Sequence, residues 1–90
     1  LLLFEQGQIK ESIIKWRKVV NIQENAEPLL ALASALFSQN PQNNESIPLA
    51  KSALLKNPNY VSEDYQKSQL WGLKLRKVTR LTCAMRDQFH

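Results

Sequence analysis

Residues 11–25, ESIIKWRKVVNIQEN, and residues 45–59, ESIPLAKSALLKNPN, carry the pattern that decides the fold. Each stretch begins with the tripeptide Glu-Ser-Ile, and the two copies are 34 residues apart. Other positions agree at the same offset: Val19 with Ala53, Val20 with Leu54, Gln23 with Asn57 and Asn25 with Asn59. An internal repeat of this period is typical of arrays in which small supersecondary units stack on one another.

The first copy lies in a predicted helix, because apolar residues in residues 9–22 recur at steps of three and four. Asn25 is a candidate N-cap for the next helix, and Glu27 and Pro28 suit its first turn. That helix carries a broad apolar face over residues 29–37. The pattern therefore predicts a helical hairpin with a short connection.

The second copy predicts a further helix. Asn43 or Asn44, at the end of a polar loop, is expected to cap a helix that runs to about Lys56. Pro48 lies near the start of this helix and would distort it if it fell beyond the first turn. The sequence Asn-Pro-Asn at residues 57–59 is expected to end it.

These motifs resemble the tetratricopeptide repeat family, whose period is 34 residues. The residues that carry the resemblance in the family's second helix are Gly7, Glu11-Ser12-Ile13, Trp16 and Val19, then Glu45-Ser46-Ile47, Ala50, Ala53-Leu54 and Asn57-Pro58. In the family's first helix they are Leu30, Ala33-Ser34 and Phe37. The sequence departs from the family pattern at both serines of Glu-Ser-Ile, at Glu24, at Pro41 and at Ala50. The resemblance implies an all-α fold of stacked antiparallel helix pairs, and the alternative is a helical bundle with an accidental echo.

The family register divides the chain into three parts. Residues 1–25 correspond to a truncated first repeat, and residues 26–59 to a complete second repeat. Residues 60–90 do not repeat the pattern and are expected to form a C-terminal capping helix. The chain opens Leu1-Leu2-Leu3-Phe4, as if inside an element already under way, so we expect the end of a longer array.

The capping helix is predicted to begin after Ser62 or Ser68 and to run to about Asp87. Its expected buried stripe consists of Trp71, Leu75, Val78, Leu81 and Met85, widened by Leu70 and Leu73. Gly72 would cost about 1 kcal/mol relative to alanine within a helix. It therefore marks either a close approach or a kink.

The positive charge is concentrated in this last segment. The chain carries a formal charge of +4, but residues 1–64 hold six basic and seven acidic residues. Residues 65–90 hold six basic residues and one acidic residue. The candidate basic patch consists of Lys74, Arg76, Lys77 and Arg80. It indicates either binding of an acidic partner, nucleic acid or anionic surface, or only a solvated helix face.

The composition gives no basis for catalysis. Cys83 is the single cysteine and His90 the single histidine, so we expect a structural thiol and no catalytic, metal-binding or cofactor-binding residues. No phosphate-binding glycine loop is present. No apolar run approaches the roughly 20 residues that span a bilayer. With no recognisable signal peptide, we expect a non-enzymatic cytoplasmic protein.

The resemblance further implies a protein-interaction scaffold that binds a peptide or partner helix in a shallow concave groove. The family register places six residues on that face: Phe4, Glu5, Ala31, Ala35, Ser38 and Gln39. Ala31 and Ala35 stand where the family's carboxylate clamp needs polar side chains, so we expect no clamp; alternatively, these alanines only allow close helix packing. Two other expectations are self-association through Leu1, Leu2, Phe4 and the apolar side of residues 9–20, and nucleic-acid binding as the less favoured function.

Overall fold

The computed structural model describes residues 2–88 and is all-α, as predicted. No β-strand occurs in that range. The elements, in chain order, are α1 (Leu2–Glu5), α2 (Ile9–Ile22), α3 (Ala26–Gln39), α4 (Ser46–Lys56), the 3-10 helix η1 (Pro58–Val61), α5 (Glu63–Ser68) and α6 (Leu73–Gln88). Leu1, with the side chain of Leu2, lies outside what is described, so that part of the predicted self-association face is not placed.

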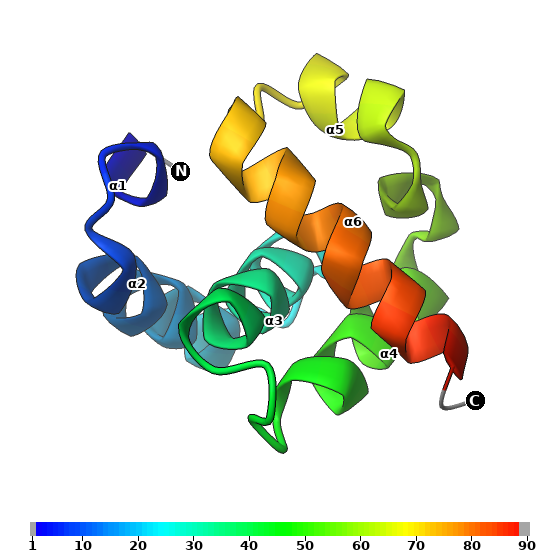
Figure 1. Cartoon of the computed structure of the whole chain (residues 1–90), viewed down its shortest axis with the longest axis horizontal. Helices are drawn as coiled ribbons and strands as arrows, with labels where there is room; N and C mark the ends of the chain where they lie inside the picture. The colour runs from blue at the N-terminus through cyan, green and yellow to red at the C-terminus, as the bar shows by residue number, and fades with distance from the viewer. Residues whose placement is uncertain (1, 89–90) are drawn as a thin grey trace.

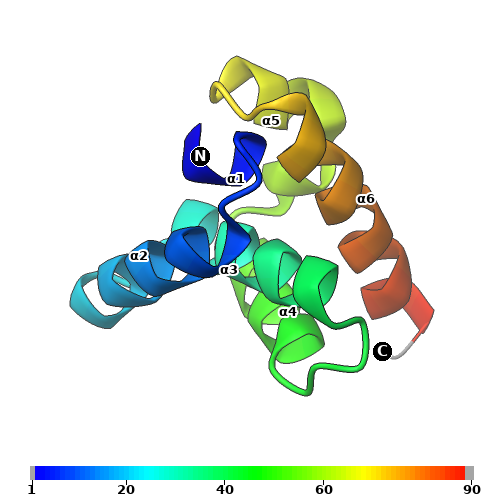
Figure 2. The same cartoon turned by 60° about the vertical axis from the view of Figure 1, so that its left-hand side comes forward.

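Helix α3 is the centre of the molecule because it is apolar on every side. Every residue from Leu29 to Phe37 is buried, whereas α2 and α4 each bury only one side. Helix α3 packs against α2, α4 and α6, and α6 runs across it in both views (Figures 1 and 2). Asn25 occupies the predicted N-cap position of α3, although its side chain makes no capping hydrogen bond.

Helix α4 begins at Ser46 rather than directly after Asn43 or Asn44. The Asn43 side chain accepts a hydrogen bond from the backbone N–H of Glu45 (2.8 Å), so it closes the turn before the helix. Pro48 therefore falls in the first turn, where its missing N–H has no intrahelical partner to lose, and α4 is uninterrupted. Asn57 ends α4 as predicted, and its side chain accepts from the N–H of Asn59 (3.1 Å).

An ion pair joins the two copies of the repeated tripeptide region. Arg17 of α2 donates two hydrogen bonds to the Glu45 carboxylate, at 3.0 and 3.3 Å. These hydrogen bonds hold the pKa of Glu45 below its ordinary value. Both side chains are exposed to solvent, so the pair contributes at most about 1 kcal/mol to stability.

The predicted C-terminal helix is divided into two, which corrects the sequence prediction. Ser62 caps α5 through its hydroxyl, which accepts from the N–H of Tyr65. Helix α5 then ends at Ser68, because Leu70 adopts a left-handed backbone with φ of 67°. The N–H groups of Leu70 and Trp71 bond to the carbonyls of Lys67 and Gln66, both at 3.0 Å. This is the hydrogen-bond pattern of a Schellman motif.

The left-handed position predicts that Leu70→Gly stabilises the protein. Leu70 is 86% exposed, so its side chain contributes little packing. The left-handed conformation costs a side-chain-bearing residue roughly 1–2 kcal/mol, and the extra unfolded-state entropy of glycine offsets about half of that. We expect the free energy of unfolding to rise by about 0.5–1 kcal/mol in urea denaturation. A decrease would show that the turn at Leu70 is not left-handed.

The buried face of α6 is rotated from the predicted stripe. Trp71 and Leu75 are buried as expected, and Val78 and Met85 are half-buried. Leu81 is 55% exposed, and Leu70 and Leu73 are also exposed, so these three were wrongly placed in the stripe. The residues buried instead are Thr79, Thr82 and Cys83.

Hydrogen bonding explains this rotation. The hydroxyls of Thr79 and Ser34 lie 2.8 Å apart in the interface between α6 and α3. The Thr82 hydroxyl donates to the carbonyl of Val78 (2.9 Å). Buried hydroxyls with partners cost little, so α6 can turn its threonines inward and leave Leu81 in solvent.

Candidate functional site

The predicted concave face is covered in this structure. Ala31 and Ala35 are fully buried, and Phe4 is almost so. Both alanines share a side of α3 with Ser34, by three- and four-residue spacing, and Ser34 bonds to Thr79 of α6. Helix α6 therefore occupies the side of α3 on which an open groove was expected, and the alanines allow close packing there.

Glu5, also predicted on the concave face, instead caps α6. Its carboxylate accepts hydrogen bonds from the backbone N–H groups of Lys74 (3.1 Å) and Leu75 (2.9 Å). The first N–H groups of a helix have no intrahelical partner and carry partial positive charge, so a carboxylate stabilises them. Gly72 packs directly on the Glu5 side chain, with no room for a Cβ atom. The close approach predicted at Gly72 is confirmed, and it ties α1 to α6.

The docking of α1 on α6 leaves a small pocket between them, which we call the α1–α6 pocket. Its volume is about 300 Å³. Its residues come from α1 and the turn after it, from the start of α2, from the end of α3 and from α6: Phe4, Gly7, Ile9, Ser38, Lys74, Lys77 and Val78. Gly7 makes the turn with a φ of 83°, a conformation that suits glycine.

This pocket brings together residues that the sequence placed in two separate sites. Phe4 and Ser38 come from the predicted concave face, and Lys74 and Lys77 from the predicted basic patch. Phe4, Ile9 and Val78 provide apolar walls, and the two lysines are exposed. Gln39 is exposed next to Ser38 but does not line the pocket. Sequence reasoning missed Ile9 and Val78, whose helical spacing was interpreted only as core.

The predicted basic patch is divided by an ion pair. Arg76 donates to the Glu63 carboxylate (3.3 Å) and to the carbonyl of Gly72, and its side chain is only 16% exposed. Lys74, Lys77 and Arg80 are exposed. The cations presented to solvent are therefore these three, and Arg76 serves mainly to hold α6 against α5.

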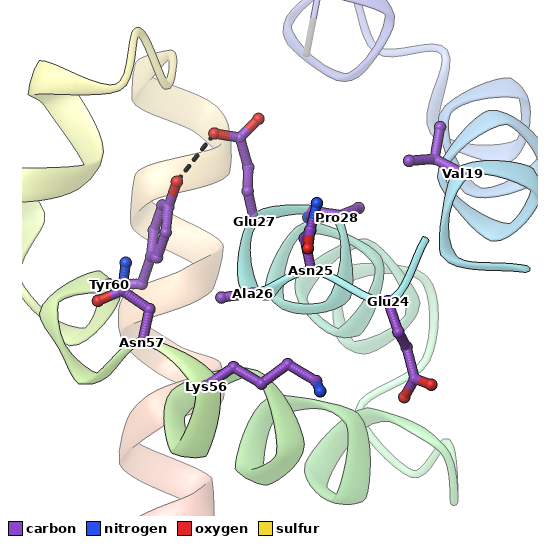
Figure 3. Close-up of a pocket in the computed structure, with 9 residues that line it drawn as sticks. All are labelled: Val19, Glu24, Asn25, Ala26, Glu27, Pro28, Lys56, Asn57 and Tyr60. Carbon is purple, nitrogen blue, oxygen red and sulfur yellow. Dashed lines mark hydrogen bonds between the residues drawn. The ribbon is translucent and has the colours of Figure 1, made fainter. Parts of the chain in front are cut away.

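A second, larger pocket lies where the turn between α2 and α3 meets the end of α4 (Figure 3). Its volume is about 710 Å³, and its charged residues are Glu24, Glu27 and Lys56. Tyr60 of η1 donates a hydrogen bond to Glu27 (2.9 Å), which Figure 3 shows on one side of the opening. Burial and this carboxylate raise the pKa of Tyr60 above its ordinary value. The hydrogen bond links η1 to α3, and the mixed charges select no single class of ligand.

The predicted self-association face is partly buried. Phe4 and Ile13 lie in the core, and the Phe4 ring packs near that of Trp16 with centroids 6.1 Å apart. The large apolar side chains that α2 does expose are Ile14, Val19 and Ile22.

Cys83 is buried, in agreement with the expected structural role of its thiol. No described helix is long and apolar enough to cross a membrane. Within the part of the chain that the structure describes, no three His, Cys, Asp or Glu side chains gather as a metal site would require. Comparison with known proteins identifies no matching family model, no matching curated protein and no matching solved structure.

Proposed function

We propose that this chain is a non-catalytic protein-interaction module of the tetratricopeptide type, which holds a segment of a partner protein at the α1–α6 pocket. The observation that carries the proposal is the pocket itself, because it combines apolar walls with two exposed lysines. Interaction sites typically combine an apolar anchor position with a polar or charged rim.

The environment of the repeated tripeptide supports the assignment to this repeat type. Ser12 and Ser46, 34 residues apart, are both buried, while Glu11 and Glu45 beside them are both exposed. Two positions with the same side-chain environment at the family's period are expected of a structural repeat, and not of an accidental echo.

The alternative is binding of nucleic acid or an anionic surface through Lys74, Arg76, Lys77 and Arg80. The ion pair between Arg76 and Glu63 weakens this alternative, because it withdraws one of the four cations. Self-association stays a prediction, for which Ile14, Val19 and Ile22 provide exposed apolar groups.

Site-specific photo-crosslinking in cells tests the proposed function. A photoreactive phenylalanine analogue replaces Ser38 at the pocket, and in a control replaces Asn59, which is exposed and outside the pocket. We expect a discrete protein adduct from position 38 that position 59 does not give. An adduct that nuclease removes would support the alternative function, and equal labelling from both positions would contradict the proposal.

A further inference from the structure

The α1–α6 pocket has room for one large apolar side chain and little more. Its volume of about 300 Å³ is at the lower end of the range for small-molecule sites. Phe4 is almost fully buried at the bottom, and Ile9 and Val78 are half-buried. Such a shape suits the anchor residue of a longer ligand rather than a whole cofactor.

The charges around the pocket are predominantly positive. Lys74, Lys77 and Arg80 follow one another at three-residue steps along α6, which places them in one row on the helix surface. All three are exposed, and the ion pairs found among the described side chains involve none of them. From α2, Lys10 is exposed beside Ile9, and Glu11 follows it on an exposed position.

The other polar groups near the pocket do not cancel this charge fully. The Glu5 carboxylate is directed at the N–H groups of Lys74 and Leu75, where the partial charge of the α6 N-terminus balances it. Helix α3 contributes only the neutral Ser38 to the pocket. The row of cations therefore begins at the pocket and continues along α6.

We propose that the α1–α6 pocket and the row Lys74, Lys77 and Arg80 bind an acidic segment of a partner protein. One large apolar side chain of that segment enters between Phe4, Ile9 and Val78, and its carboxylates face the row. This inference rests on the proposed protein-interaction function and adds the chemistry of the partner. Charge complementarity decides for an acidic peptide, because the pocket supplies the apolar contact and the row supplies the charge.

A nucleic acid fits the same surface less well. Single-stranded nucleic acids bind through exposed aromatic rings on which bases stack, in addition to cations. Phe4 and Trp71, the aromatic residues at the two ends of the contact between α1 and α6, are both buried. The row would thus offer phosphates a charge contact without a stacking platform.

Fluorescence anisotropy with defined peptides tests the proposal on the full-length protein. The probe is a fluorescein-labelled peptide with one leucine among glutamates. Two matched peptides carry alanine in place of the leucine, or lysines in place of the glutamates. We expect the acidic leucine peptide to bind, the alanine peptide to bind about tenfold more weakly, and the lysine peptide not to bind.

Three variants locate the binding. Lys74→Glu with Lys77→Glu is expected to weaken binding of the acidic leucine peptide by tenfold or more, roughly. The matched control, Lys18→Glu with Lys67→Glu, changes the net charge equally at exposed positions outside the pocket and is expected to bind almost as the parent does. Ser38→Trp, which fills the pocket from its exposed edge and leaves all cations in place, is expected to abolish the preference for leucine over alanine. Far-UV circular dichroism verifies that each variant is folded.

The outcomes separate this inference from the proposed function. Equal losses in the two double variants would indicate general charge attraction and overturn the inference. A neutral leucine peptide that binds as well as the acidic one would also overturn it, while the crosslink from position 38 would keep the proposed function. Tighter binding of single-stranded RNA or of phosphatidylserine vesicles, lost in Lys74→Glu with Lys77→Glu, would overturn both.

Discussion

Trp71→Ala is expected to lower the free energy of unfolding by about 3–5 kcal/mol, the cost typical of removing a buried tryptophan. Trp71 is 2% exposed and lies where α5 gives way to α6. Its ring packs near that of Tyr60, with centroids 5.4 Å apart, and Tyr60 in turn contacts Tyr65 edge-on. The substitution therefore opens a cavity where η1, α5 and α6 meet. Because domains of this size have a total stability of about 5–15 kcal/mol, the loss is a large share.

Urea denaturation followed by far-UV circular dichroism measures this effect without relying on tryptophan fluorescence. Trp71→Phe is the matched control, since it keeps an aromatic ring in the site and is expected to cost less than half as much. A change below about 1 kcal/mol for Trp71→Ala would contradict the packing of the C-terminal segment on the rest of the chain, because surface substitutions have effects of that size.

Gly72→Ala and Glu5→Ala are each expected to destabilise the protein by about 2 kcal/mol, through the same contact. Glu5→Ala removes the carboxylate that accepts from the N–H groups of Lys74 and Leu75. Hydrogen bonds to a charged group contribute about 1.5–3 kcal/mol, and helix-capping groups about 0.5–2 kcal/mol. A Cβ at position 72 would overlap the Glu5 side chain, which can move aside only by giving up those bonds.

The two substitutions are therefore expected to be strongly non-additive. In a double-mutant cycle, Gly72→Ala with Glu5→Ala should cost little more than either change alone. Glu5→Gln keeps one acceptor oxygen and is expected to be intermediate. Costs that simply add up in the double variant would mean that Gly72 and Glu5 do not share a contact.

The repeated Glu-Ser-Ile stretches predict the helical hairpins because local spacing decides them. The bounds of α2 and α3, the end of α4 at Asn57 and the burial of residues 29–37 follow from apolar periodicity and from capping residues. The division of the last helix does not follow, because Leu70 takes a left-handed conformation that leucine rarely adopts.

Partners far apart in the sequence account for the rest of the differences. Hydropathy indicates that Leu81 is core and Thr79 is surface, but Ser34 on α3 satisfies the Thr79 hydroxyl and reverses the order. Glu5 was interpreted as a partner-binding residue because its contact with the N-terminus of α6 spans 69 residues of sequence. Side-chain spacing along one helix carries no information on such contacts.

The candidate site shows the same division. Phe4 and Ser38, and separately Lys74 and Lys77, were selected from the sequence for two different functions. Their meeting in one pocket depends on how α6 crosses α3 and reaches α1, which follows from the Glu5 cap and the Ser34–Thr79 contact. Residue type thus identifies candidate recognition groups, and only the packing of α6 shows which of them act together.

The most direct test of this account is amide hydrogen exchange at Lys74 and Leu75, measured residue by residue by NMR. Both residues lie in the first turn of α6, where N–H groups have no partner within the helix and ordinarily exchange rapidly. If Glu5 holds α6 against α1 and so forms the α1–α6 pocket, both amides are protected in the parent protein and lose protection in Glu5→Ala. Rapid exchange of both amides in the parent protein, or protection that survives Glu5→Ala, would contradict it.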